Sequence, residues 1–123
     1  MDLEPVKPRP TVRIGHSPDP DDAFMYYGLA SGRVPTGPYE VEQVLKDIES
    51  LNRLALEGSI EVTAVSIHAY AYLADRYLLL PCGASMGDGY GPIVVTRAAA
   101  APDALKRMII VIPGRLTTAA LAL

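Results

Sequence analysis

The spacing of hydrophobic and polar positions changes several times between residues 11 and 76. Runs in which apolar and polar residues alternate predict strands, and segments whose apolar residues recur every three or four positions predict helices. Strands are expected at residues 11–16, 39–45 and 61–65, and helices at residues 21–32, 47–58 and 66–76. Because strands and helices alternate, we expect an α/β fold with a parallel sheet and right-handed crossovers.

Residues 47–58 give the clearest helix prediction. Asp47 is a good N-cap residue, and Gly58 follows the last apolar position. The apolar positions between them are Ile48, Leu51, Leu54 and Ala55. This stripe is typical of an amphipathic helix.

Later apolar runs predict further strands. Residues 77–81 are expected to form a short buried strand. The β-branched runs at residues 91–97 and 108–113 suit strands covered on both faces. The alanine-rich connection at residues 98–106 is expected to hold a short helix.

Composition limits the class of protein. The chain has 123 residues, of which 50% are hydrophobic and 20% charged, with a net charge of -3. This composition fits one globular domain, although sheets that close over a ligand usually belong to larger proteins. Because Lys and Arg are outnumbered and form no run, we expect no nucleic-acid or membrane partner. A small-molecule partner fits better.

The compartment can be inferred from two absences in the sequence. No apolar stretch has the length of a signal peptide or a membrane span, so we expect a cytoplasmic protein. Cys82 is the single cysteine, which excludes a disulfide within the chain and favours a reducing compartment. A lone thiol of this kind is expected to be a small buried hydrophobe.

The final segment has no boundary signal. After residues 108–113 the sequence GRLTTAALAL predicts a loop and then a helix that is still apolar and uncapped at Leu123. An apolar stripe of this kind would face water. We therefore expect either a truncated protein or self-association through this segment.

Three junctions between strands and helices carry polar residues. In α/β sheets, ligands bind where strands end and helices begin. The candidate binding residues are Ser17, Asp19, Asp21 and Asp22 after the first strand, Ser66 and His68 after the third, and Gly114, Thr117 and Thr118 in the last segment. Gly114 would allow close backbone approach, and the amides and hydroxyls that follow it would favour a carboxylate.

Each junction also has a purely structural interpretation. Asp19, Pro20 and the next two acids are what a helix N-terminus favours. Ser66 and both threonines could serve as caps, and His68 could be a packed or hydrogen-bonded histidine. The spacing of the aspartates matches no known calcium loop, so no metal is expected.

Five segments, taken in order, resemble the enzymes of the futalosine route to menaquinone. They are SPDPDDAFMYYGLASGRV, VLKDIESLNRLALEG, AVSIHAYAYLADRYLLL, SMGDGYGPIVV and IPGRLTTAALAL. Within that group they are most similar to the 1,4-dihydroxy-6-naphthoate synthase family, whose members carry S-P-x-P-[ND]-D-x-F, L-N-x-x-A-L-x-G and P-G-x-x-T-T motifs. The resemblance extends from about Thr11 to the end of the chain.

The resemblance implies a two-lobed fold like that of type II periplasmic binding proteins, with the ligand between the lobes. Residues 1–10 would form a disordered tail, 11–96 the first lobe, 97–107 the crossing and 108–123 the start of a truncated second lobe. The implied activity is that of a carbon–carbon lyase that splits cyclic dehypoxanthine futalosine to 1,4-dihydroxy-6-naphthoate. No cofactor is implied. The cleft would be lined by seven of the nine candidate residues, with the two threonines on the substrate carboxylate: Ser17, Asp19, Asp21, Asp22, Ser66, Thr117 and Thr118.

Two departures from the family pattern qualify this function. The presumed catalytic histidine of the family lies beyond Leu123, so this chain by itself is expected to be inactive. Positions 19 and 21 are often Cys and Asn in relatives, and aspartate at both makes the pocket more acidic. Two alternatives stay open: chorismate dehydratase of the same pathway, and a solute-binding protein without enzyme activity.

Overall fold

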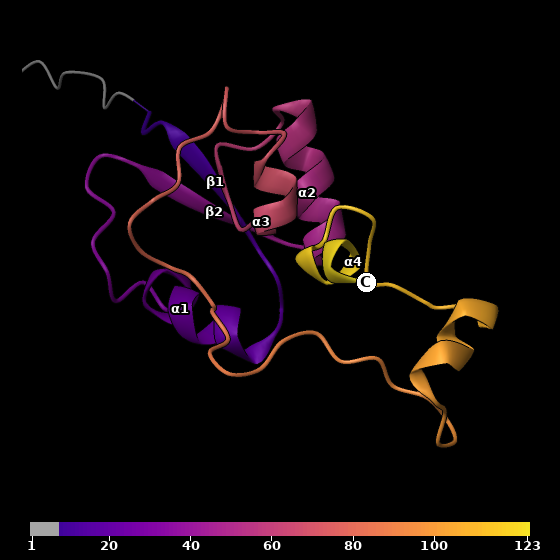
Figure 1. Cartoon of the computed structure of the whole chain (residues 1–123). Coiled ribbons are helices and arrows are strands. Elements are labelled where there is room, and N and C mark those ends of the chain that lie inside the picture. The colour runs from indigo at the N-terminus through magenta and orange to yellow at the C-terminus, as the bar shows by residue number, and fades with distance from the viewer. Residues whose placement is uncertain (1–7) are drawn as a thin grey trace, which may run out of the picture.

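The computed structural model describes residues 8–123, so residues 1–7 of the expected disordered tail lie outside the described part. The elements in chain order are β1 (Thr11–His16), α1 (Pro20–Ala30), β2 (Glu40–Leu45), α2 (Ile48–Glu57), β3 (Val62–Thr63), α3 (Ile67–Tyr70), the 3₁₀ helix η1 (Pro102–Arg107) and α4 (Thr118–Ala122). Strands and helices alternate as the sequence predicts, and the fold is α/β (Figure 1).

The sheet is small and parallel, with strand order β2-β1-β3. All six residues of β1 are paired with β2, and Ile14 and Gly15 are also paired with β3. Because β1 is central, its second half is buried. The carboxyl end of β1 therefore delivers Ser17 and the following acids to one edge of the sheet.

Helix α2 forms as its sequence predicts. The Asp47 carboxylate caps it by accepting a hydrogen bond from Ser50 N at 3.0 Å, and Gly58 ends it in the left-handed region with φ of 69°. Leu51 and Ala55 are fully buried, and Ala55 packs in a core cluster with Ala69 and Leu73. This packing attaches α2 to the segment that follows β3.

The middle of the chain is less regular than predicted. The strand expected at residues 61–65 is reduced to Val62–Thr63. The helix expected at residues 66–76 ends after Tyr70, and residues 71–76 continue as turns. Their packing still resembles that of a helix, because Ala69 and Leu73 are both fully buried.

The strands predicted at residues 77–81, 91–97 and 108–113 are wrong. These residues have no strand structure and are mostly exposed: Leu78 is 90% exposed and Ile109 97%. A β-branched sequence favours a strand only where a neighbouring strand can pair with it, and the described residues do not supply one. The short helix expected at residues 98–106 is confirmed as η1, which lies apart from the sheet in Figure 1.

Helix α4 returns to the body of the molecule and lies beside α3 (Figure 1). Leu121 and Leu123 are more than half exposed, and self-association through this end stays a prediction. Within residues 8–123, no helix is long and apolar enough to cross a membrane.

Candidate functional site

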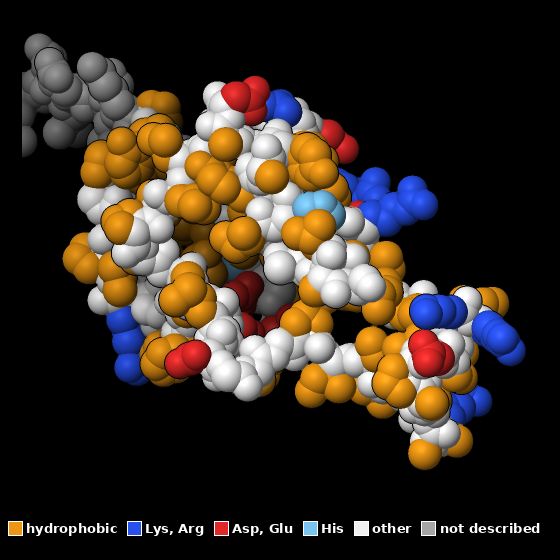
Figure 2. All heavy atoms as spheres, viewed as in Figure 1, with side chains coloured by type: hydrophobic (Ala, Val, Ile, Leu, Met, Phe, Trp, Pro, Cys, Tyr) orange, Lys and Arg blue, Asp and Glu red, His pale blue; other side chains and the backbone are white. Residues whose placement is uncertain are grey.

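A cleft of about 1080 Å³ opens beside the carboxyl ends of the strands. Ser17, Asp19, Asp21 and Asp22 line it, as do Tyr26 and residues 78–80 and 82–86. Figure 2 shows a hollow on this face with acidic side chains inside it and hydrophobic side chains around it. The first predicted junction thus faces a cavity large enough for a small molecule.

The opening loop is held by its own polar groups. The buried Asp22 carboxylate accepts a hydrogen bond from Ser17 N at 2.7 Å. The Ser17 hydroxyl donates to Asp19 Oδ2 and accepts from Asp19 N, both at 3.1 Å. Asp19 occupies the N-cap position of α1, but its side chain caps no helical N–H. Asp19 therefore stands at the start of the helix, as the structural interpretation expected, but its carboxylate bonds within the loop and does not cap α1.

Asp21 and Tyr26, on the wall of the cleft, have shifted pKa values. Interaction with the Ser85 side chain, followed by the Asp22 backbone N–H, lowers the pKa of Asp21 below its ordinary value. Burial raises the pKa of Tyr26, and the nearby Asp22 adds to this shift. The Tyr26 ring stacks on His16, with centroids 4.3 Å apart. The cleft thus combines anionic groups with a neutral phenol.

The second and third junctions meet each other. His68 N donates to Thr118 Oγ1 at 3.3 Å, and His68 Nδ1 lies 3.1 Å from the Thr117 carbonyl oxygen. Since a carbonyl only accepts hydrogen bonds, Nδ1 carries the proton in this contact. His68 is therefore hydrogen-bonded, as its structural interpretation expected, and it joins two segments about 50 residues apart.

Thr117 and Thr118 have different surroundings. Thr117 is 4% exposed, and its hydroxyl donates to the Gly114 carbonyl at 2.8 Å and accepts from Ala120 N at 3.2 Å. It is the N-cap of α4, which confirms its structural interpretation. Thr118 is exposed and its hydroxyl proton is not committed by the bond from His68. Thr118 is thus the threonine that is free to donate to a ligand.

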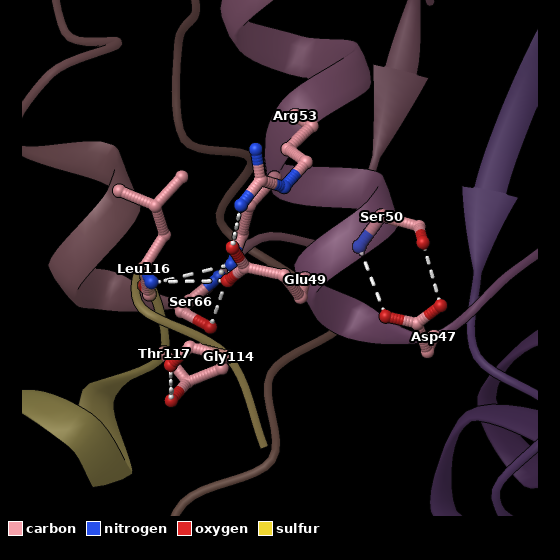
Figure 3. A network of polar contacts seen from close by, with 9 residues as sticks. Asp47, Glu49, Ser50, Arg53, Ser66, Gly114, Leu116 and Thr117 are labelled. Carbon is pink, nitrogen blue, oxygen red and sulfur yellow. Dashed lines mark hydrogen bonds and ion pairs between the residues drawn. The ribbon is translucent and has the colours of Figure 1, made fainter. Parts of the chain in front are cut away.

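Two residues that were not among the candidate binding residues join these loops, although one of them is the asparagine of the L-N-x-x-A-L-x-G motif. Glu49 and Asn52 belong to α2. Glu49 accepts from Leu116 N at 3.0 Å (Figure 3), and Asn52 Oδ1 accepts from Ser66 N at 2.9 Å. Asn52 is fully buried although it is polar. Its place beside Leu51 and four positions after Ile48, on the apolar side of the helix, was a signal that could have indicated a buried hydrogen-bonding role.

The nine predicted residues therefore form two groups. Ser17, Asp19, Asp21 and Asp22 lie together on the cleft wall. Ser66, His68, Gly114, Thr117 and Thr118 surround the contact between α3 and α4. Ile67, between Ser66 and His68, also lines the cleft. Within residues 8–123 no hydrogen bond joins the two groups directly.

A family model described as Menaquinone biosynthesis matches residues 12–123. The chain belongs to this family. It is 46% identical over 108 residues to the 1,4-dihydroxy-6-naphthoate synthase of Thermus thermophilus, a match that covers 88% of this chain and 39% of that protein. It is 39% identical over 109 residues to the synthase of the same name from Streptomyces coelicolor, covering 89% and 38% of the two chains.

The chain is also similar to a protein of known crystal structure. A structural genomics protein from Archaeoglobus fulgidus is 52% identical, with a TM-score of 0.68 over 73% of this chain and 34% of that chain. The chain spans about two fifths of the length of the two curated relatives. What those whole enzymes do is therefore carried to this member of the family only as a proposal.

The exposure of Cys82 differs from the expectation that it would be buried. The thiol is exposed and lines the cleft, so it is not the small buried hydrophobe that its solitary occurrence predicted. The segment that carries it, residues 78–86, has no sheet partner and lies over the cleft instead of in a core. In the described part of the chain, no three His, Cys, Asp or Glu side chains are grouped so as to hold a metal ion.

Proposed function

We propose that this chain forms the substrate-binding part of a 1,4-dihydroxy-6-naphthoate synthase of menaquinone biosynthesis. The observation that carries the proposal is the contact of His68 with Thr117 and Thr118, within a chain that matches the family from residue 12 to 123. Two loops that the resemblance assigns to the ligand are thereby adjacent.

The proposed architecture is a two-lobed fold like that of type II periplasmic binding proteins. Residues 11–96 would form the first lobe, 97–107 the crossing and 108–123 the first segment of the second lobe. The sparse contacts of residues 91–113 and the return of α4 to α3 support a crossing segment at this place. The cleft beside β1 would then be one wall of the space between the lobes.

The charges of the two groups favour one orientation of the substrate. The opening loop contributes three carboxylates, which repel another carboxylate and accept hydrogen bonds from hydroxyl groups. The exposed Thr118 hydroxyl and the neighbouring backbone can donate instead. We therefore place the substrate carboxylate at Thr118 and an uncharged, hydroxyl-bearing part of the substrate at Asp19 and Asp21.

The residues of this chain bind and orient in this proposal. Thr118 holds the carboxylate, Ser17 and Asp22 keep the opening loop in shape, and Tyr26 forms an apolar wall with a hydroxyl at its edge. None of them is assigned the proton transfer. Incubation of the purified 123-residue chain with cyclic dehypoxanthine futalosine is accordingly expected to release no dihydroxynaphthoate, and release would contradict this division of roles.

Binding of the product tests the proposal directly. Isothermal titration with 1,4-dihydroxy-6-naphthoate should show binding that its methyl ester lacks, because the ester has no carboxylate. Thr118→Val should weaken binding about ten- to hundredfold, since a hydrogen bond to a charged group contributes roughly 1.5–3 kcal/mol. The matched control is Thr96→Val, because Thr96 is exposed and bonds only Ala98 O.

Three results would contradict the proposal. Equal affinity for the acid and its ester would remove the carboxylate site. Tighter binding of chorismate than of dihydroxynaphthoate would favour the sister enzyme, chorismate dehydratase. If Thr118→Val binds the acid as tightly as the parent does, the carboxylate does not lie at Thr118.

A further inference from the structure

We propose that Glu49 and Asn52 of α2 are positioning residues that hold the loop of Ser66 and the loop of Thr117 against each other. Neither side chain lines the cleft. Each instead bonds backbone of a loop that carries candidate binding residues. These contacts support the positioning role, and its importance for substrate binding rests on the proposed function.

Asn52 uses both ends of its amide. Its Oδ1 accepts from Ser66 N at 2.9 Å, and its Nδ2 donates to Ser66 Oγ at 3.2 Å and points to the Leu116 carbonyl at 3.5 Å. The side chain is fully buried, so each lost bond would leave a polar group without water. An amide is suited to this place because it accepts from one loop and donates to both.

Glu49 holds the other loop from the preceding turn of the same helix. Its Oε2 accepts from Leu116 N at 3.0 Å, while its Oε1 accepts from Arg53 at 2.8 Å. Gly114 packs directly on it, because a Cβ added to Gly114 would lie 2.5 Å from the Glu49 Cβ. The loop thus runs along the Glu49 side chain with no room for a larger residue.

The contacts of Glu49 and Asn52 together hold the starts of α3 and α4 in place. Ser66 begins α3, and Leu116 precedes Thr117, the cap of α4. The distance between His68 and Thr118 therefore depends on where α2 holds both loops. Figure 3 shows Ser66 and Leu116 of these loops beside Glu49. Loss of either contact is expected to loosen the contact of His68 with Thr118 while the β1–β2 pairing stays intact.

Amide hydrogen exchange by NMR tests the positioning without any ligand. Glu49→Ala should speed exchange of the Leu116 amide about tenfold, because the bond to a charged acceptor is lost. Glu49→Gln keeps an acceptor oxygen and should restore part of the protection. The matched control is Glu57→Ala at the exposed end of the same helix. Shifted resonances of His68 and Thr118 in Glu49→Ala, but not in Glu57→Ala, would show that the junction moves.

The same variants separate this inference from the proposed function. If Glu49→Ala leaves the Leu116 exchange rate and the His68 and Thr118 resonances unchanged, the positioning role is refuted. If these change as expected but the unmodified chain does not bind 1,4-dihydroxy-6-naphthoate, the positioning is supported and the proposed function fails. With both correct, Glu49→Ala weakens that binding about tenfold and Glu49→Gln does so less. Asn52→Ala is a second variant, to be used only if circular dichroism shows that it folds.

Discussion

Gly15 lies at the centre of the sheet, where a single added methyl group tests the packing of α2. It is buried in β1 between Val44 of β2 and Thr63 of β3. A Cβ at this position would lie 2.7 Å from Ile60 Cδ1, from Leu51 Cδ2 and from Thr63 Oγ1. Each distance is about 0.7 Å shorter than the 3.4 Å at which ordinary contact begins. Gly15→Ala therefore forces three neighbours to move at once.

The expected cost follows from two opposing effects. Overpacking of a well-packed core costs typically about 1–3 kcal/mol. Replacing Gly by Ala in a strand also stabilises the folded state by roughly 0.5–1 kcal/mol, because the unfolded chain loses conformational freedom. Leu51 is fully buried and cannot turn into solvent, so the cost should lie in the upper half of its range. We expect a net destabilisation of about 1–2 kcal/mol.

Urea denaturation followed by circular dichroism measures this difference. Gly15→Ala should lower the midpoint with little change in slope, and the melting temperature should fall by roughly 5–15 °C. Gly91→Ala is the matched control, because a Cβ there meets nothing within 4 Å and its φ is not positive. Its stability should stay within about 0.5 kcal/mol of the parent. A Gly15→Ala variant as stable as the parent would refute the close packing of α2 on β1.

Three further predictions concern the surface. Asp47→Ala removes both bonds to Ser50 that start α2 and should lower the melting temperature by several degrees, with Glu57→Ala unchanged. The bond to Arg13 lowers the pKa of Glu61 to about 2, so the stabilisation from this pair is complete above about pH 5 and lost as the pH falls towards 2. The free energy of unfolding of Glu61→Gln should therefore change less with pH between about 5 and 2 than that of the parent. Cys82 should react with a thiol reagent in the folded protein, and bound dihydroxynaphthoate should slow the reaction; equal rates would place the ligand away from this wall.

The first half of the fold could be predicted because its signals are local. The Asp47 cap, the apolar stripe of α2 and the left-handed Gly58 each depend on a few neighbouring residues. The alternating pattern of residues 11–16 likewise gave β1 with its observed bounds. The parallel direction of the strands followed from the alternation of strands and helices, whereas the strand order β2-β1-β3 and its register were not predicted.

The later apolar runs could not be placed by the same method. Residues 91–97 and 108–113 have strong β propensity, yet propensity describes how well a residue fits a sheet and does not supply the sheet. In the structure β3 is only two residues long and forms one edge. Strand formation is a pairwise event, and a sequence pattern reports on only one partner of the pair.

Gly114 has a close contact that the sequence pattern did not reveal. Its place before two threonines predicts close backbone approach at a ligand site, which stays a prediction, and in the structure its close neighbour is Glu49. In the proposed function, Glu49 and Asn52 of α2 therefore support the binding loops without touching the substrate. In the opening loop the buried Asp22 carboxylate accepts from Ser17 N and so supports the wall of the cleft that it lines. Asp19, Asp21 and Thr118 have exposed side chains beside these supports. In the proposed function they are therefore the residues through which substrate choice would change while the fold stays the same.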